Sequence, residues 1–151
     1  MKLSFSLTGL VVFALPMLIN LAYVLWPPVG DAQPPTGITR WVEIVEKVSR
    51  MAYLFAIVLL VSDRALPGKR AYLWLAVVFL ALYYAVWLRY FLTGRDPARL
   101  GQAFLCVPMP LAVFPVLYYL CAALWLGNLP AAGLMLLFGA AHLTVSIQSF
   151  R

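Results

Sequence analysis

Long apolar runs are the feature that most limits what this chain can fold into. Residues 3–26, 71–88, 103–126 and 129–150 contain no Asp, Glu, Lys or Arg, and a membrane-spanning helix needs about 20 such residues. The composition agrees, since 65% of the 151 residues are hydrophobic and 11% are charged, against about 25% charged in soluble domains. The sequence therefore excludes a soluble domain and a disordered chain, and predicts an all-α integral membrane protein.

Breaks between the apolar runs divide the chain into five predicted spans. The segment 26–40 holds four prolines and two glycines, which end a helix. A basic turn at 63–70 and a polar loop at 94–102 separate the next spans. The spans are expected at 3–26, 43–62, 71–93, 103–126 and 129–150. Because the connections are short, we expect sequential helices to be antiparallel neighbours in a compact five-helix bundle, a single domain over 1–151.

The first run resembles a secretory signal peptide in its positive start. However, the apolar run 3–26 is longer than the apolar core of a typical signal peptide, which has about 7–15 residues. No small-x-small cleavage site follows it. We therefore expect this run to remain as a spanning helix.

Three prolines, Pro108, Pro110 and Pro115, interrupt the fourth predicted span. Each lacks the amide N–H that a regular helix needs. Two alternatives are open: the helix begins near Pro108, or it is broken or kinked inside the membrane. Irregular backbone at membrane depth is tolerated only where it is buried in protein or lines a cavity. The segment is therefore the best sequence indication of a cavity.

The second predicted span carries four charges on one stripe. They are Glu43, Glu46, Lys47 and Arg50, at i, i+3, i+4 and i+7. The spacing predicts ion pairs Glu43–Lys47 and Glu46–Arg50. An unpaired charge at the membrane centre costs about 2.5–3.5 kcal/mol. The stripe therefore forms either a juxtamembrane turn whose charges reach the lipid headgroups or an interior polar pocket.

Arg89 lies near the end of the third predicted span and has three interpretations. Its side chain can snorkel to the interface, or pair with Glu43 or Glu46. It can also offer its planar guanidinium to an anionic ligand such as a phosphate or carboxylate.

His142, the only histidine, shares a helix face with Gly139, Ser146 and Ser149. Small residues beside polar ones suit close helix packing. This face therefore predicts a contact with another helix, a second copy of the chain or a membrane partner. The alternative is a histidine that accepts a proton or binds a ligand.

The remaining candidates are polar or aromatic wall residues. Asn20 is expected to cap the carbonyl that Pro16 leaves without a helical donor. Tyr83, Trp87 and Tyr90 are typical of an interfacial aromatic belt, and they also suit the walls of a pocket for an apolar ligand. All the polar candidates fall in the half of the predicted bundle nearer the loops 27–40 and 94–102.

Several chemistries are disfavoured by missing motifs. Cys106 and Cys121 are separated by about 22 Å of helical rise, too far for a disulfide, and no CxxC is present. HExxH, GxSxG and Walker-type loops are absent, and one histidine cannot form a bis-histidine haem site. Asp31, Asp63 and Asp96 all fall in predicted loops. We therefore predict no metal, no cofactor and no catalytic residue.

The sequence supports three function hypotheses. The first is binding of a small molecule or lipid in a pocket open to one leaflet, by a transporter, carrier or sensor. Its site would use Glu43, Glu46, Arg50, Arg89, His142, Asn20, Tyr83, Trp87 and Tyr90. The second is an enzyme acting on a lipid or isoprenoid headgroup. The third is an accessory subunit of a larger membrane complex.

The net charge of +6 does not indicate nucleic-acid binding, because the basic residues sit between apolar runs. We expect membrane lipids and an anionic or amphipathic small molecule as partners, and a multi-pass position in a bacterial cell membrane. Seven basic residues lie on the predicted site's face and four opposite. Without Lys47, Arg50 and Arg89, which could be buried, the count is four on each face, so the orientation is undecided.

Overall fold

The computed structural model describes residues 1–29, 40–63, 66–96 and 98–149. Their regular secondary structure consists of helices and one short strand pair. The helices are α1 (Leu7–Leu25), α2 (Arg40–Leu59), α3 (Lys69–Leu92), α4 (Ala98–Gly101), α5 (Pro110–Trp125) and α6 (Leu129–Ser149). Strand β1 (Lys2–Leu3) pairs antiparallel with β2 (Leu60–Val61). The predicted all-α class is confirmed.

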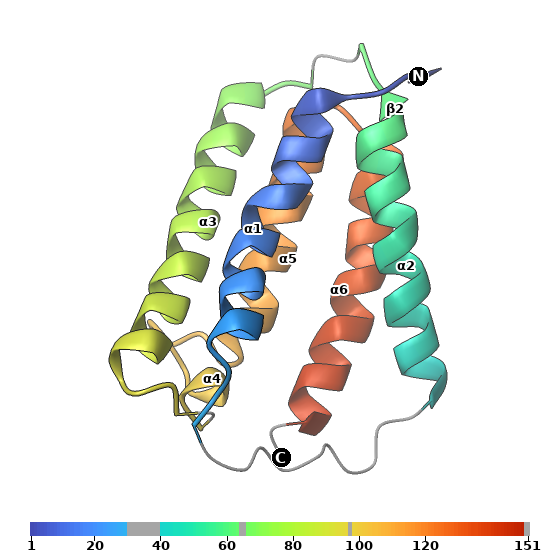
Figure 1. Cartoon of the computed structure of the whole chain (residues 1–151). Coiled ribbons are helices and arrows are strands. Elements are labelled where there is room, and N and C mark those ends of the chain that lie inside the picture. The colour runs from blue at the N-terminus through green and yellow to red at the C-terminus, as the bar shows by residue number, and fades with distance from the viewer. Residues whose placement is uncertain (30–39, 64–65, 97, 150–151) are drawn as a thin grey trace.

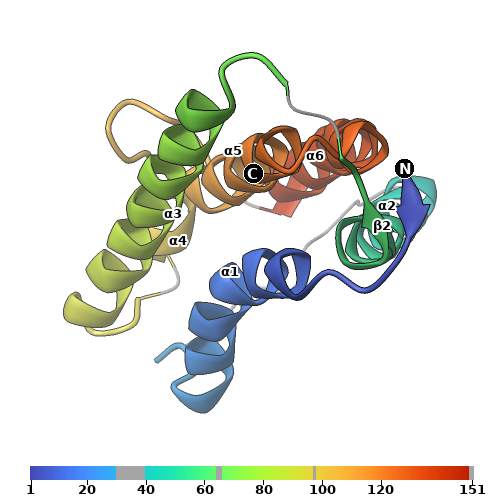
Figure 2. The ribbon, with the colours of Figure 1, turned by 90° about the horizontal axis from the view of Figure 1, so that it is seen from above.

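The five long helices run side by side (Figure 1). Helix α2 packs mainly on α6, α3 packs mainly on α5, and α5 also packs on α6. Seen from above, α1 lies between α2 and α3, on one side of the α5–α6 pair (Figure 2). The short helix α4 lies at the end of the bundle where α3 ends.

Three helices, α1, α3 and α6, are long and apolar enough to cross a membrane by length and composition. Helix α5 is apolar but shorter. Large apolar side chains cover the outside of the bundle, for example Val24, Trp74 and Leu92. A soluble monomer rarely exposes contiguous apolar patches of this kind, so the outer surface agrees with a membrane protein.

The first helix begins at Leu7, later than the predicted start of the span 3–26, because residues before it cap α2. The N–H of Ser4 donates to the Leu59 carbonyl (2.9 Å), and the N–H of Ser6 donates to the Val58 carbonyl (2.7 Å). The last carbonyls of a helix have no partner within it, and these extended residues supply one.

Helix α1 then approaches α2 closely at Gly9. A methyl group at this position would overlap the Ile57 carbonyl oxygen. The Ser6 hydroxyl accepts from the Gly9 N–H (2.9 Å) and caps the start of α1. The absence of a side chain at Gly9 is therefore what allows the two backbones to meet.

Asn128 joins the end of α2 to the start of α6. Its Nδ2 donates to the carbonyls of Ala56 (2.8 Å) and Leu60 (2.7 Å), and its Oδ1 accepts from the Ala131 N–H (3.1 Å). The side chain is buried, and every one of its hydrogens and its oxygen has a partner. This residue therefore fixes the register of the two helices.

Prolines set the start of α5. The helix begins at Pro110, whose missing N–H is not needed in the first turn. Pro108 lies outside it, and Pro115 is the proline inside it. Of the two sequence alternatives, a helix starting near Pro108 is therefore confirmed, and the predicted span 103–126 is too long at its beginning.

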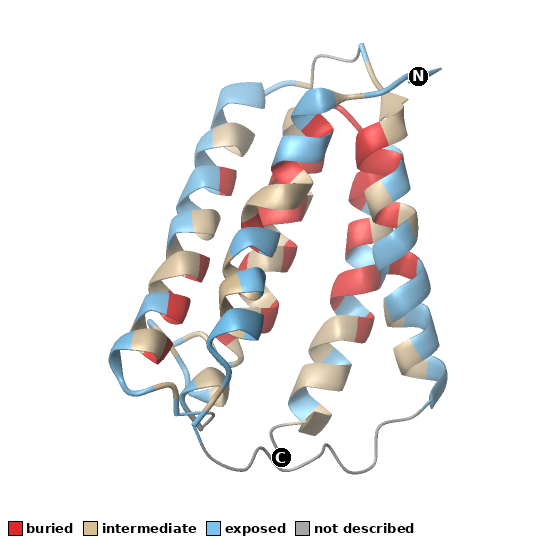
Figure 3. Cartoon of the chain, viewed as in Figure 1, coloured by how far each residue is buried: buried red, intermediate tan, exposed pale blue. Residues whose placement is uncertain are grey.

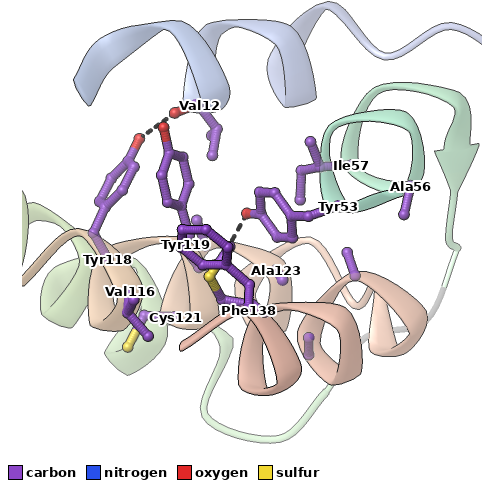
Figure 4. Close-up of a cluster of buried hydrophobic side chains, with 14 of the residues drawn as sticks. Val12, Tyr53, Ala56, Ile57, Val116, Tyr118, Tyr119, Cys121, Ala123 and Phe138 are labelled. Carbon is purple, nitrogen blue, oxygen red and sulfur yellow. Dashed lines mark hydrogen bonds between the residues drawn. The ribbon is translucent and has the colours of Figure 1, made fainter. Parts of the chain in front are cut away.

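A proline also shapes α1, and tyrosines compensate for it. Pro16 cannot donate to the Val12 carbonyl, and the Tyr118 hydroxyl of α5 donates to it instead (2.8 Å; Figure 4). Tyr119 donates to the Phe13 carbonyl (2.9 Å). The prediction that Asn20 caps the freed carbonyl is wrong, because a neighbouring helix already supplies the donor.

Most buried residues of α3 lie toward its own C-terminal end, whereas in α2 and α6 buried residues concentrate toward the end of the bundle that holds the chain's N-terminus (Figure 3). There Ile57, Ala123 and Ala131 belong to one apolar cluster that also includes Tyr53. The other ends of α2 and α6 are half-buried or exposed. Helices α2 and α6 are thus best packed near the chain's N-terminus, and a second buried cluster around Val86 and Phe114 packs α3 on α5 in the half that holds most of the polar candidates.

Candidate functional site

A cavity of about 240 Å³ lies between α1, α2, α3, α5 and α6. An empty cavity of about 150 Å³ can hold benzene, and drug-sized ligands occupy about 300–1,000 Å³. The space therefore suits one ring system or a short chain. Its lining residues are Phe13, Met17, Asn20, Arg50, Tyr53, Tyr83, Trp87, Leu111, Pro115, Tyr119, Met135, Phe138 and His142.

The walls are largely aromatic and apolar. Tyr119 stacks on Phe13 (ring centroids 5.9 Å apart) and meets Tyr53 edge-on (5.2 Å). The Tyr53 hydroxyl donates to the Tyr119 carbonyl (3.0 Å), so the phenol is held in place (Figure 4). These contacts give the cavity a rigid apolar surface on the side of α1, α2 and α5.

A partly buried polar pair borders the cavity. Nδ1 of His142 lies 3.0 Å from Oε1 of Glu46, and the side chains are 27% and 13% exposed. An ionised carboxylate can only accept, so Nδ1 carries the proton and Nε2 is the free ring nitrogen. The ring also stacks on Phe138, with centroids 4.9 Å apart. Glu46 does not line the cavity itself, but it orients the histidine that does.

The predicted ion pairs of α2 have different outcomes. Glu43–Lys47 is confirmed at 3.8 Å, whereas the described residues show no Glu46–Arg50 pair. The Glu46–Arg50 prediction is wrong because the Glu46 carboxylate turns to His142 of α6. Arg50 instead contributes to the cavity lining.

Asn20, Tyr83 and Trp87 form the polar part of the opposite wall. The Tyr83 hydroxyl donates to Asn20 Oδ1 (2.7 Å), and Asn20 Nδ2 lies 3.9 Å from the Met17 sulfur. Trp87 meets Tyr83 edge-on, but its buried indole N–H has no hydrogen-bond partner in the described part of the chain. These three predicted wall residues do line the cavity.

Arg89 has a different place. Its guanidinium donates to the carbonyls of Ala103 (3.1 Å), Arg99 (3.0 Å) and Gln102 (3.0 Å), and it lies over the Phe104 ring. The predicted pairing with Glu43 or Glu46 is wrong, because α3 and α2 are on opposite sides of α1 (Figure 2). Arg89 fixes the segment around α4.

Two further candidates lie outside the cavity lining. Glu43 is close to the start of α2, where it pairs with Lys47. Tyr90 is buried in an aromatic cluster with Tyr23 and Phe91. Their predicted role in binding stays a prediction.

Several lining residues were not predicted, among them Tyr53, Tyr119 and Phe138. Tyr53 follows Arg50 by three residues and continues the Glu46–Arg50 stripe, so the helical periodicity of that stripe would have identified it. The other two lie on strongly apolar helices, where no polar pattern marks the inward face.

A second cavity of about 200 Å³ adjoins the first. It is lined by Leu100, Met109, Leu111, Ala112, His142 and Ser146. Leu111 and His142 line both cavities. The histidine ring therefore stands between the central space and the end of the bundle that holds α4.

The face predicted to meet another chain is partly used within this one. Gly139 packs against Val116 of α5, and an added methyl would overlap that side chain. Ser149 donates to the Val145 carbonyl of its own helix. A contact of this face with another chain stays a prediction.

Cysteine and metal chemistry find little support around the cavity. Cys106 is exposed, Cys121 is buried, and both are free thiols. Across residues 1–29, 40–63, 66–96 and 98–149, no three His, Cys, Asp or Glu side chains gather as a metal site would need.

Comparisons with protein-family models, with curated proteins and with solved structures find no match to this chain.

Proposed function

We propose that this chain is a multi-pass membrane protein that binds a small amphipathic molecule or a lipid in a cavity at membrane depth. The observation that carries the proposal is the aromatic cavity of about 240 Å³ between five helices, with a few polar groups in its wall. Ligand sites have this composition, with apolar walls and a few polar groups that fix orientation. Such binding would serve a transporter, a carrier or a sensor.

Five spans are supported by the direction of the helices. The N–H of Ser6 at the start of α1 and Asn128 before α6 both bond to the end of α2. The N–H of Val29, after α1, donates to the Arg95 carbonyl, after α3. Helices α1, α3 and α6 thus run in one direction, so α2 and α5 must return through the same thickness. If the first three cross a membrane, the other two cross as well.

The surface of α2 supports the same conclusion. Its outer surface carries large apolar side chains beside the exposed Lys47, for example Val48, which is 63% exposed, and Phe55, which is 56% exposed. A helix on a water-soluble protein has its apolar stripe inward. Helix α2 has apolar residues on its inward face and further large apolar side chains on its outer face, which suits a helix whose outer face meets lipid.

The topology can be tested with an impermeant maleimide in sealed membrane vesicles. On a background with both native cysteines changed to Ser, Val29→Cys and Pro67→Cys should react from opposite sides. Restoring Cys106 alone should give labelling from the Val29 side. Reaction of Val29→Cys and Pro67→Cys from the same side would show that α2 does not cross.

Binding can be tested with a matched pair of bulky substitutions on α1. Met17 lines the cavity, whereas Leu18 beside it is 57% exposed on the outer surface. Native mass spectrometry of protein purified in dodecyl maltoside should detect a defined small-molecule or lipid adduct. We expect Met17→Trp to remove this adduct and Leu18→Trp to retain it.

The binding proposal fails under two outcomes. One is an adduct of equal occupancy in Met17→Trp and the unmodified chain. The other is an unmodified chain that carries only a heterogeneous set of bulk lipids.

A second candidate function is catalysis on a lipid or isoprenoid headgroup, which the Glu46–His142 pair favours. A histidine oriented by a carboxylate is a common general base, and here the ring lines both cavities. Mass spectrometry of lipid extracts and isoprenyl phosphates, before and after incubation with protein, should show a product that His142→Ala does not form. Identical profiles for the two proteins would exclude this function.

A further inference from the structure

We propose that the ligand of the central cavity carries an oxyanion, a carboxylate or a phosphate, which binds the Arg50 guanidinium. The inference rests on the proposed function, since it names the chemical class of the cavity's ligand. It is carried by the position of Arg50, its lack of a partner and the polar groups that surround the same space.

Arg50 lies at the middle of α2. The helix has 20 residues from Arg40 to Leu59, which is about 30 Å at 1.5 Å per residue. Arg50 is therefore about 15 Å from the helix start, close to the middle of a hydrocarbon core about 30 Å thick. Arginine at this depth normally faces a cavity or a partner and marks a functional site.

The guanidinium of Arg50 has no hydrogen-bond or ion-pair partner among the described residues. Arg50 forms no ion pair or side-chain hydrogen bond with any described residue, although Glu46 is one turn away. The Glu46 carboxylate binds His142 instead, at 3.0 Å. Arg50 is an exposed residue that also lines the cavity. Since an unpaired charge at membrane depth is unfavourable, an anion bound in the cavity would stabilise it.

The cavity lining favours an anion over a cation. No Asp or Glu is among the lining residues. The buried Trp87 N–H, on a residue that is 5% exposed, lies beside the Tyr83 hydroxyl and forms no well-aligned hydrogen bond to a described residue. The Asn20 amide reaches only the Met17 sulfur. Donors from α1, α2 and α3 are therefore available in one space without a competing carboxylate.

The rest of the cavity fits an apolar body attached to that group. Phe13, Tyr119 and Phe138 form apolar walls, and the Tyr119 hydroxyl is already used by the Phe13 carbonyl. A planar guanidinium binds a carboxylate or phosphate through two parallel hydrogen bonds. The combination describes a small amphipathic anion, from either a free organic acid or the phosphate of a lipid.

Three probes with the same alkyl chain distinguish a free organic acid from a lipid phosphate. Octanoate, octyl phosphate and octanol share an eight-carbon chain and differ in the head. We would titrate each into delipidated full-length protein in dodecyl maltoside by calorimetry. At least one of the anions should bind about tenfold or more tightly than octanol. Preference for octanoate indicates a free acid, and preference for octyl phosphate indicates a lipid phosphate.

Arg50→Gln should remove this preference and leave octanol binding unchanged. Arg40→Gln is the matched control, because it removes the same charge at the exposed start of α2. Nuclear magnetic resonance of indole-labelled protein gives an independent readout. The Trp87 signal, assigned with Trp87→Phe, should shift when the anion binds, and the signal of the exposed Trp74 should not.

The outcomes distinguish this inference from the proposed function. Equal affinity for all three probes, with binding blocked by Met17→Trp, would overturn the anion and retain the binding cavity. An anion preference that survives Arg50→Gln would overturn the role of Arg50. Failure of all three probes to bind, with no effect of Met17→Trp on co-purified molecules, would overturn both.

Discussion

The imidazole of His142 donates to the carboxylate of Glu46 across 3.0 Å, and this hydrogen bond joins α6 to α2 beside the central cavity. The two residues are 96 positions apart in the chain. The bond holds the ring between the two cavities and occupies the Glu46 carboxylate, which is one helical turn from Arg50. It therefore links the stability of the bundle to the charge of the site.

Removing the imidazole should destabilise the protein. His142→Ala leaves the mostly buried Glu46 carboxylate without its donor, which costs about 1–3 kcal/mol. We expect a lower midpoint of thermal unfolding in dodecyl maltoside. His142→Asn keeps an N–H near the position of Nδ1 and should recover part of the loss.

Thr144→Ala is the control for that substitution. Thr144 is exposed and bonds only to the Ala140 carbonyl of its own helix, so its loss should leave the midpoint nearly unchanged. Equal stability of His142→Ala and Thr144→Ala would contradict the importance of the pair.

A second prediction concerns Tyr118, whose hydroxyl donates to the carbonyl that Pro16 leaves without a helical donor. Tyr118→Phe removes the donor to the Val12 carbonyl and should cost about 0.5–1.5 kcal/mol. Pro16→Ala restores a helical N–H to the same carbonyl. In that background Tyr118→Phe should therefore cost less than half as much, as measured by a double-mutant cycle of unfolding free energies.

Tyr72→Phe provides the comparison for a phenol on α3, outside this contact. Additive effects of Tyr118→Phe and Pro16→Ala would show that the hydroxyl does not compensate for the proline.

A third prediction concerns the Asn128 joint. Asn128→Ala removes two donors and one acceptor and should cost about 1–3 kcal/mol. Asn128→Asp should be worse, by about 3 kcal/mol or more, because an acceptor-only carboxylate would be buried against the carbonyls of Ala56 and Leu60. Chemical denaturation in detergent measures both.

The order of these two variants is the decisive point. Asp and Asn are equally good residues at a helix N-terminus, so Asn128→Asp would be neutral if capping α6 were the residue's whole role. An Asp variant more stable than the Ala variant would rule out the bonds to α2.

A fourth prediction compares two helix glycines. Gly9→Ala places a methyl group against the Ile57 carbonyl, so α1 must move away from α2 and the protein should lose about 1–3 kcal/mol. Gly133→Ala meets open space on α6. It should be neutral or stabilising by up to about 1 kcal/mol, since Ala favours helix more than Gly. Equal midpoints of thermal unfolding for Gly9→Ala and Gly133→Ala would contradict the close approach of α1 and α2 at Gly9.

Much of the fold follows from the sequence because apolar runs and helix breakers act locally. Proline and glycine positions predict where helices end, and the start of α5 at Pro110 follows one of the two alternatives for that segment. The later start of α1 could not be predicted, because it depends on Ser4 and Ser6 reaching the end of α2. A contact across the bundle leaves no local pattern.

The same distinction applies to the site. Polar residues in apolar helices are conspicuous, so Asn20, Arg50 and His142 were identified, and all three line the cavity. The specific hydrogen bond between Glu46 and His142 could not be predicted, since Glu46 has an acceptable partner one turn away on its own helix and meets His142 only when α2 packs on α6. In the sequence, an aromatic lining residue such as Phe138 cannot be told apart from an apolar residue that faces lipid.

The uneven attachment of α2 has a mechanical consequence. Main-chain groups and Asn128 hold its C-terminal end, through the carbonyls of Val58, Leu59 and Leu60. Toward its N-terminal end, the hydrogen bond that the described residues show to another helix is the one between Glu46 and His142. Helix α2 is thus held unevenly: main-chain groups secure its C-terminal end, whereas its N-terminal half depends on one side-chain hydrogen bond and on packing against α6.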